Sequence, residues 1–219
     1  MPPFSEAFVR TTPFGVLAGF DFPPSAESIP EALHADERAH AATLSPRRRP
    51  EWIGGRLAFA RAASERGWPR VALGTGPRGE PALPEGLAGS ISHKNALAVA
   101  LVARADGATL GVDLEALAPA RPSIEEIALR AEEREALHRL PDAERWHALV
   151  LAFAVKEALY KALHPRLRRY VRYDEAAVRL PAEGPEIRLF LDGGVRFRTE
   201  VHLEPLDGFA LACVRVTGS

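Results

Sequence analysis

The sequence predicts an α+β fold made of two similar α+β halves, residues 1–106 and 107–219. Strand, helix and then several more strands occur twice in similar lengths, which is typical of an internal structural repeat. A turn at 105–107 separates the two series, and no long linker or low-complexity segment lies between them. With 219 residues, 47% of them hydrophobic, the chain can bury a substantial core, as one domain or as two subdomains.

In the first half, residues 14–21 alternate apolar and small side chains, as in a strand. A helix is predicted over 46–66, closed by Gly67. Three short strands follow, at 71–74, 89–93 and 96–104. Residues 74–79 match the G-x-G-x-x-G pattern of dinucleotide-binding loops, but prolines at 81 and 84 oppose the helix that such a loop needs. This segment is therefore predicted to be an ordinary loop.

The second half restarts with a strand over 109–115, followed by polar helical stretches between 123 and 139. A long helix is predicted over 142–163, stopping before Pro165 because a proline disfavours helical backbone in the preceding residue. Four more strands complete the half, at 176–180, 186–191, 196–203 and 209–216.

The charge and the apolar pattern exclude several classes of protein. A formal net charge of -1 gives no overall attraction to nucleic acid or to an anionic membrane, so any phosphate must be recognised locally. No apolar run is long enough to span a bilayer, and the first ten residues lack the pattern of a signal peptide. We therefore expect a cytoplasmic protein. Cys213 is the single cysteine and lies in an apolar stretch, so core packing is expected of it rather than catalysis.

An acidic pair ends the first strand of the second half. Asp113 and Glu115 are two residues apart in a strand, so both carboxylates leave the same face. Two such groups can begin a site for a hard cation, although an acidic pair at a strand end is more often only solvated.

The long helix carries a third acid. Glu157 and Lys161 are four residues apart and share a helix face, which by itself would describe a weak surface ion pair. The surrounding sequence is rich in alanine and apolar residues, however, so the carboxylate of Glu157 is expected to be partly buried and to need a cation. Magnesium held by Asp113, Glu115 and Glu157 would meet that need.

Phosphate-binding groups are predicted in the first half. Ser92, His93 and Lys94 place a hydroxyl, an imidazole and an ammonium at one strand end, a combination suited to an anion. Arg48 and Arg56 lie two helical turns apart on one face of the predicted helix. The alternatives are a structural histidine and a solvated arginine face. Only three of the 28 basic residues are lysines, which suggests that a compact ammonium is wanted at those positions, although chance would also explain it.

Five short motifs follow one another along the chain. They are Arg48-Arg49-x-x-Trp52-x-x-x-Arg56, Gly79-Glu80-Pro81, Gly89-Ser90-Ile91-Ser92-His93, Gly111-Val112-Asp113-Leu114-Glu115 and Phe153-x-x-Lys156-Glu157-x-x-x-Lys161. Each is modest alone, but their order and spacing resemble the 4'-phosphopantetheinyl transferases, in particular the enterobactin-synthesis type that serves siderophore, nonribosomal-peptide and polyketide assembly lines.

The resemblance implies a monomer of the long form, in which two similar halves are related by a pseudo-twofold axis and the active site lies in the cleft between them. It implies transfer of the 4'-phosphopantetheine arm of coenzyme A to a serine of an acyl or peptidyl carrier protein, with release of 3',5'-adenosine bisphosphate. It further implies magnesium, or manganese in its place, held by Asp113, Glu115 and Glu157. The residues implied in contacts with coenzyme A are Arg48, Arg56, Arg78, Ser92, His93, Lys156 and Lys161. Many relatives have Trp at the position of Phe153 and Lys near that of Arg78.

Two catalytic roles are predicted. Lys161 would stabilise the charge that develops on the pyrophosphate, and Glu157 would take the proton from the carrier serine, directly or through a water on the metal. An acidic carrier would dock on Arg166, Arg168, Arg169 and Arg172, or on the 123–139 region, although a solvated basic loop is an equally simple reading.

Two other functions compete with this prediction. One is a non-catalytic coenzyme A or nucleotide-binding regulator, against which the three acids argue. The other is a different metal-dependent phosphotransferase or a nuclease. The balanced charge and the lack of interleaved aromatic and basic residues make nucleic acid a poor substrate.

Overall fold

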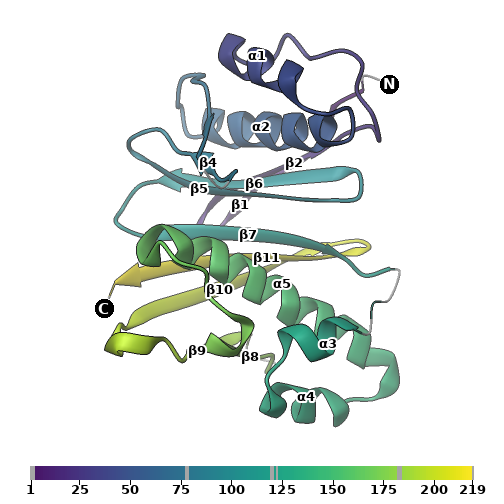
Figure 1. The fold of residues 1–219 in the computed structure, drawn as a ribbon, viewed down its shortest axis with the longest axis vertical. Helices are drawn as coiled ribbons and strands as arrows, with labels where there is room; N and C mark the ends of the chain where they lie inside the picture. The colour runs from purple at the N-terminus through teal and green to yellow at the C-terminus, as the bar shows by residue number, and fades with distance from the viewer. Residues whose placement is uncertain (1–2, 77–78, 119–120, 122, 182–183, 219) are drawn as a thin grey trace. The chain divides into compact units, whose positions relative to one another are not determined.

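Two antiparallel sheets, each with a long helix packed against it, form the framework of the protein (Figure 1). The computed structural model describes residues 3–76, 79–118, 121, 123–181 and 184–218. The chain divides into two compact units, Met1–Asp106 and Gly107–Ser219. Both units combine sheet and helices, so the predicted α+β class is confirmed.

The sheet of the first unit has four antiparallel strands in the order β1-β2-β6-β5. Their bounds are Ser5–Thr12 for β1, Gly15–Asp21 for β2, Leu87–Lys94 for β5 and Leu97–Arg104 for β6. Strand β6 is buried over six consecutive residues, so the side chains on both of its faces are shielded from solvent. Two very short strands, β3 (Gly74–Thr75) and β4 (Pro81–Ala82), pair separately.

Helix α2 (Arg48–Ser64) packs on this sheet, and α1 (Ala35–Thr43) packs on α2. The Gly54-Gly55 pair allows the close approach of α2. A Cβ on Gly54 would lie 2.9 Å from the Phe22 ring and 3.1 Å from Ala98, and one on Gly55 would lie 2.8 Å from the side chain of Ile91. Two residues without a Cβ therefore let the helix backbone rest against the strands.

The sheet of the second unit has the order β10-β11-β7. Its strands are β7 (Thr109–Ala116), β10 (Phe197–Leu206) and β11 (Phe209–Gly218), and the strands β8 (Ala176–Arg179) and β9 (Glu186–Leu189) form a second, two-stranded sheet. Two 3-10 turns, η1 (Tyr173–Glu175) and η2 (Asp192–Gly194), flank these two strands. Cys213, in the middle of β11, is completely buried.

Helix α5 (Asp142–Leu167) crosses β7 and β11, and the shorter helices α3 (Ser123–Ala128) and α4 (Ala131–His138) pack against it. Its approach to the sheet depends on Gly111, because a Cβ at that position would overlap the backbone carbonyl of Ala158. Gly111 thus brings the strand that carries two of the predicted acids directly against the helix that carries the third.

The two units share one topology. In each, a strand leads through helices to a separate two-stranded sheet and then to two antiparallel strands, the last of which pairs with the first. The strands β2, β6 and β5 of the first unit correspond in order to β7, β11 and β10 of the second. The two units therefore have the same order of connected elements, apart from the additional strand β1 in the first.

Several predicted elements differ from the structure. The predictions miss β1 and α1, and the predicted strand at 71–74 is only the two-residue β3. Helix α5 continues through Pro165 to Leu167. The proline removes a single backbone donor, and the extra turn is held because Arg166 donates to Thr109 Oγ1 at 2.8 Å and to the Val216 carbonyl at 3.0 Å. Within the described part of the chain, none of the helices has both the length and the apolar character to cross a bilayer.

Candidate active site

The acidic pair of β7 is buried beneath two cations. Asp113 is 5% exposed and Glu115 is 9% exposed. Lys161 of α5 donates to Asp113 Oδ1 at 2.7 Å and also to the Val112 carbonyl at 3.0 Å. Arg121 donates to Glu115 Oε2 at 3.1 Å. Because burial removes most of the hydration of these carboxylates, each needs a cation close by.

Glu157 faces the same region from α5. The hydroxyl of Tyr173 donates to its Oε1 atom. Burial raises the pKa of Glu157, the bond from Tyr173 opposes that rise, and the negative charges of Asp113 and Glu115 add to it. The three predicted acids therefore share one electrostatic neighbourhood, and adding a proton or a cation there is favourable.

The predicted metal site is not preformed. Among the described residues, no three His, Cys, Asp or Glu side chains are grouped closely enough to hold a metal ion. The physical reason is charge repulsion: without a cation between them, the acids take partners from the chain itself, namely Lys161, Arg121 and Tyr173. The donor set still suits a hard cation, since it consists of carboxylate oxygens whose mutual repulsion a divalent ion would relieve.

The structure gives Lys156 a role other than the predicted contact with coenzyme A. Its side chain is fully buried. The ammonium donates to Glu133 Oε2 at 2.6 Å, to the Ala128 carbonyl at 2.7 Å and to the Tyr173 carbonyl at 3.1 Å. An ammonium has three donors, and these bonds use all of them. The structure therefore does not support a phosphate contact for Lys156, and it places this residue in the core of the second unit.

In the first unit, two of the predicted phosphate-binding residues, Arg48 and His93, are brought together. Arg48 of α2 pairs with Glu51 at 2.7 Å, and Glu51 lies 3.3 Å from Nδ1 of His93 on β5. Ser92, the preceding residue of β5, is 6% exposed. Glu51 thus bridges the helix and the strand that carry these residues, and sequence reasoning missed it.

Arg56 lies about two turns after Arg48 in the same helix and is 4% exposed. Its guanidinium stacks 4.3 Å from the Trp52 ring and donates to the Gly74 carbonyl at 3.1 Å and to Thr75 Oγ1 at 3.0 Å. Within the described residues, Nε has no acceptor. Burial lowers the pKa of Arg56 to about 10. A buried guanidinium whose hydrogen-bond partners in the described part of the chain are neutral is a favourable place for an anion. The prediction for Arg78 falls outside the described residues.

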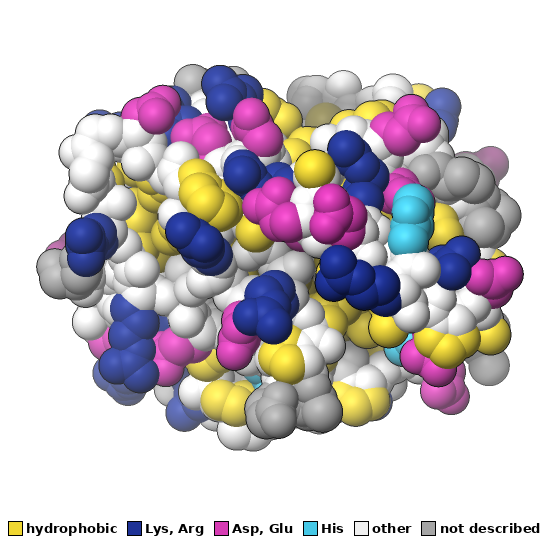
Figure 2. Space-filling model, turned by 90° about the horizontal axis from the view of Figure 1, so that it is seen from below, with side chains coloured by type: hydrophobic (Ala, Val, Ile, Leu, Met, Phe, Trp, Pro, Cys, Tyr) yellow, Lys and Arg dark blue, Asp and Glu magenta, His cyan; other side chains and the backbone are white. Residues whose placement is uncertain are grey.

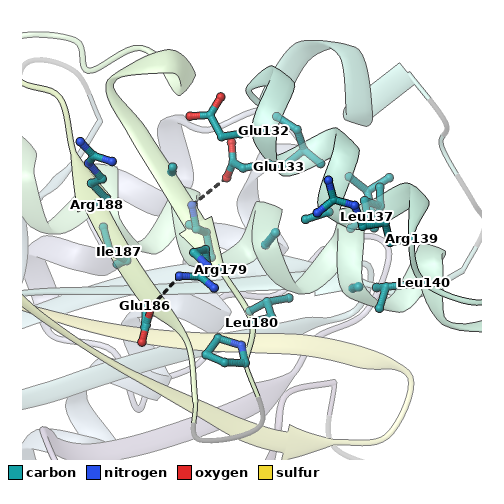
Figure 3. A pocket seen from close by; sticks show the side chains of 18 of the residues that line it. Glu132, Glu133, Leu137, Arg139, Leu140, Arg179, Leu180, Glu186, Ile187 and Arg188 are labelled. Atoms are coloured by element: carbon teal, nitrogen blue, oxygen red, sulfur yellow. Dashed lines mark hydrogen bonds and ion pairs between the residues drawn. The ribbon is translucent and has the colours of Figure 1, made fainter.

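A pocket of ≈ 600 Å³ lies elsewhere in the second unit (Figure 3). Helices α4 and α5 and the strands β8 and β9 line it, with the charged side chains of Arg139, Arg179 and Arg188 among its walls. Glu133, the partner of Lys156, also borders this pocket. None of the predicted site residues lines it.

Three of the four arginines predicted for carrier docking have partners within the second unit. Arg166 donates to the Thr109 hydroxyl of β7 and to the Val216 carbonyl of β11. Arg169 binds Glu175 at 2.6 and 2.9 Å, and Arg172 binds Asp174 at 2.9 and 3.0 Å. Arg168, at the end of α5, is exposed. On the face drawn in Figure 2, acidic and basic side chains occur in small neighbouring groups rather than as a basic belt.

The comparisons with known proteins bear on both units. The model of the 4'-phosphopantetheinyl transferase N-terminal domain matches residues 36–103, and that of the 4'-phosphopantetheinyl transferase superfamily matches residues 109–214. The first match contains α2 and β5, and the second contains β7 and α5.

Characterised relatives are similar over most of the chain. The 4'-phosphopantetheinyl transferase Svp of Streptomyces mobaraensis is 33% identical over 81% of this chain and 72% of its own length. The 4'-phosphopantetheinyl transferase Npt of Nocardia iowensis is 34% identical over 70% and 68%. Enterobactin synthase component D of Salmonella typhi is 35% identical over 55% and 50%.

Among solved structures, the holo-[acyl-carrier-protein] synthase of Thermotoga maritima matches 50% of this chain and 63% of its own, at a TM-score of 0.43 and 23% identity. The two family models and the relatives with a third of their residues in common show that the chain belongs to the 4'-phosphopantetheinyl transferase superfamily, a family of transferases.

Proposed function

We propose that the protein transfers the 4'-phosphopantetheine arm of coenzyme A to a serine of an apo acyl or peptidyl carrier protein and releases 3',5'-adenosine bisphosphate. This proposal rests on the electrostatic interaction of Glu157 with Asp113 and Glu115 in the second unit. All three acids lie within the range that the superfamily model matches, residues 109–214. Coenzyme A and a carrier are the substrates that the family name implies for this chain.

We propose magnesium as the metal of the reaction, with manganese as a substitute, held by Asp113, Glu115 and Glu157. When bound, it would supply a Lewis acid for the diphosphate of coenzyme A. Lys161 is one-third exposed and lies 2.7 Å from Asp113. Its ammonium can therefore face the same diphosphate and stabilise negative charge there.

In the first unit, Arg48, Arg56 and His93 would bind the phosphate groups of coenzyme A, and Ser92 would lie against the cofactor. The support for this part is the buried guanidinium of Arg56 and the bridge between Arg48 and His93 through Glu51. Arg78 is proposed here from its place in the sequence alone.

The reaction needs one bond exchange at phosphorus. The serine oxygen forms a bond to the β-phosphorus, the bridging P–O bond breaks, and 3',5'-adenosine bisphosphate leaves with the electron pair. Glu157 would receive the serine proton. Burial and two acidic neighbours raise the pKa of Glu157. A carboxylate with a raised pKa binds a proton more strongly and is therefore a better general base.

A mass measurement tests this function. The purified protein is incubated with coenzyme A, magnesium and an apo carrier protein, and the carrier is then weighed by mass spectrometry. We expect a gain of one phosphopantetheine, absent with EDTA and absent for a carrier whose modified serine is replaced by alanine. Binding of coenzyme A without any gain in carrier mass would instead support a non-catalytic binding protein.

A further inference from the structure

Tyr173 is fixed to α5 at two points. Its hydroxyl donates to Glu157 Oε1, and its backbone carbonyl accepts from Lys156 Nζ at 3.1 Å. Its ring packs edge-on against Tyr160, with 5.3 Å between ring centroids, and lies 6.0 Å from the Phe153 ring. Two neighbouring residues of one helix therefore hold the two ends of the same tyrosine.

The turn that presents Tyr173 is itself rigidly held. Glu175, the last residue of η1, is 5% exposed and makes a two-pronged ion pair with Arg169 at 2.6 and 2.9 Å. It also accepts from the Arg172 backbone at 2.8 Å, and its own carbonyl accepts from Phe190 at 2.8 Å. These contacts hold the turn from which the Tyr173 side chain extends toward α5.

Lys156 connects this turn to the rest of the unit. Its ammonium joins the Tyr173 carbonyl to Glu133 of α4 and to the Ala128 carbonyl at the end of α3. All three acceptors are buried or partly buried, so the contact is water-excluded and geometrically specific. The adjacent position on α5 is Glu157, the acid on which the proposed function depends.

We propose that Tyr173 is a positioning residue for Glu157, with Lys156 holding the tyrosine in place. This inference rests on the proposed function. The phenol occupies Oε1, and among the described residues Oε2 accepts no hydrogen bond, so Oε2 is the oxygen available to the metal ion or to the serine proton. Holding one oxygen fixes the orientation of the other, which lowers the cost of ordering the carboxylate when the ligand binds.

Two tyrosine variants test the proposal. Tyr173→Phe keeps the ring and removes only the hydroxyl. Tyr160→Phe is its matched control, because the hydroxyl of Tyr160 lies in the same aromatic cluster but has no hydrogen-bond partner among the described residues. We expect Tyr173→Phe to lower kcat and the affinity for Mn²⁺ by about 10- to 100-fold, as is usual when a partner of a metal ligand is removed. Tyr160→Phe should match the wild type in both.

The affinity for Mn²⁺ is measured without substrates, by a titration in which electron paramagnetic resonance detects the free ion. This readout does not require transferase activity. KM for coenzyme A and for the carrier should stay within about twofold, since the proposal gives Tyr173 a contact with Glu157 and none with either substrate. All variants are compared well below their melting temperatures, so a partial loss of stability does not enter the result.

A double variant separates positioning from a general structural effect. In a Glu157→Gln background, Tyr173→Phe should have no further effect on Mn²⁺ affinity, because the tyrosine acts only through that carboxylate. The proposal is overturned if Tyr173→Phe behaves like Tyr160→Phe, if it binds Mn²⁺ more tightly than the wild type, or if its effect persists in the double variant.

A wild type that binds Mn²⁺ but transfers nothing would refute the proposed function alone, and the metal titration would still decide the role of Tyr173. A wild type that does neither would refute both.

Discussion

Each of the two units contains a buried glutamate, and the two glutamates make equivalent hydrogen bonds. Glu37 of α1 and Glu133 of α4 are 3% and 7% exposed, and each occupies the third position of its helix. Each accepts the backbone N–H of the residue before its helix and one backbone N–H from a later segment of its unit. The donors are His34 at 2.9 Å and Leu73 at 3.0 Å in the first unit, and Arg130 at 2.7 Å and Val178 at 2.7 Å in the second.

The units differ in the cation that neutralises this glutamate. In the first unit it is Arg70, a one-third-exposed residue of a loop, at 3.1 Å. In the second it is Lys156, fully buried on the long helix and next to Glu157. In the second unit, the buried ion pair and the proposed reaction centre are therefore adjacent, because Lys156 precedes Glu157 on one helix. In the first unit, the cation of the ion pair lies outside α2, and α2 carries Arg48 and Arg56 instead. Under the proposed function, one scaffold would support the chemistry in one unit and the recognition of phosphate in the other.

The largest effect is expected where the second unit would act chemically. Glu157→Gln should lower kcat by about 10²- to 10⁴-fold, the usual contribution of a general base, and also weaken Mn²⁺ binding. The fold should be retained, because Gln keeps an acceptor for the Tyr173 hydroxyl. Steady-state kinetics with an apo carrier and a circular dichroism melt check both points. Near-normal turnover would exclude Glu157 as the base.

The next effect concerns the two counter-ions. Lys156→Met leaves Glu133 buried without a cation, so we expect a loss of about 3–5 kcal/mol in the free energy of unfolding. Arg70→Ala, the equivalent change in the first unit, removes a one-third-exposed partner and leaves Glu37 with the charge of Arg56 nearby, so it should cost less, about 1–2 kcal/mol. Urea unfolding measures both. The double variant Glu133→Gln/Lys156→Met should be more stable than Lys156→Met, and if it is not, the buried pair does not explain the loss.

A third prediction concerns the glycines at the helix–sheet contacts. Gly111→Ala places a Cβ against the backbone carbonyl of Ala158, which cannot move without shifting α5, so we expect a loss of about 3 kcal/mol. Gly55→Ala meets only the side chain of Ile91, which can change rotamer, and should cost about 1 kcal/mol or less. Equal losses in urea unfolding would mean that the close approach of α5 is not specific to Gly111.

A smaller effect is expected for recognition in the first unit. Arg48 is 55% exposed, so Arg48→Ser should leave the fold intact. It should raise KM for coenzyme A by about tenfold with kcat nearly unchanged, as expected for the loss of one charge-assisted contact made equally before and during the reaction. A change in kcat alone would instead place Arg48 in the chemistry.

The smallest effect is expected at Cys213. Burial raises the pKa of this thiol to about 12, so it stays neutral and inaccessible at mildly alkaline pH. Iodoacetamide at pH 8.5 should therefore leave the native protein unlabelled and label it in urea. Because the first unit has no cysteine, the urea dependence of labelling reports the opening of the second unit alone. Labelling that begins before the first unit unfolds would show that the two units lose structure separately.

Regular side-chain patterns made much of the fold predictable. Strands β5, β6 and β7 and the long helix α5 have the expected positions, since their apolar residues recur with the period of the element. Helix α1 could not be found in this way. Its buried positions hold Glu37 and Ala41, so a charged residue marks the inner face of the helix and the apolar period is lost.

The site was predictable only where the residues lie in short motifs. The motifs indicated Asp113, Glu115 and Glu157, but neither the partners of these acids nor the burial of Lys156. Glu133 precedes Lys156 by 23 residues and Tyr173 follows Glu157 by 16, so no local spacing connects them. Such contacts depend on how α3, α4 and η1 pack around α5, which a single sequence does not encode in any short pattern.

The position of Cys213 also has a practical consequence. The thiol of Cys213 is buried in β11 and does not react in the native protein. Cysteines introduced at the surface would therefore react selectively, and Cys213 would not have to be replaced. Replacing exposed Ser64 in one unit and exposed Arg168 in the other would provide two attachment points for a fluorescent donor and acceptor. The efficiency of energy transfer between these dyes would then follow any change in the spacing of the two units as coenzyme A is added.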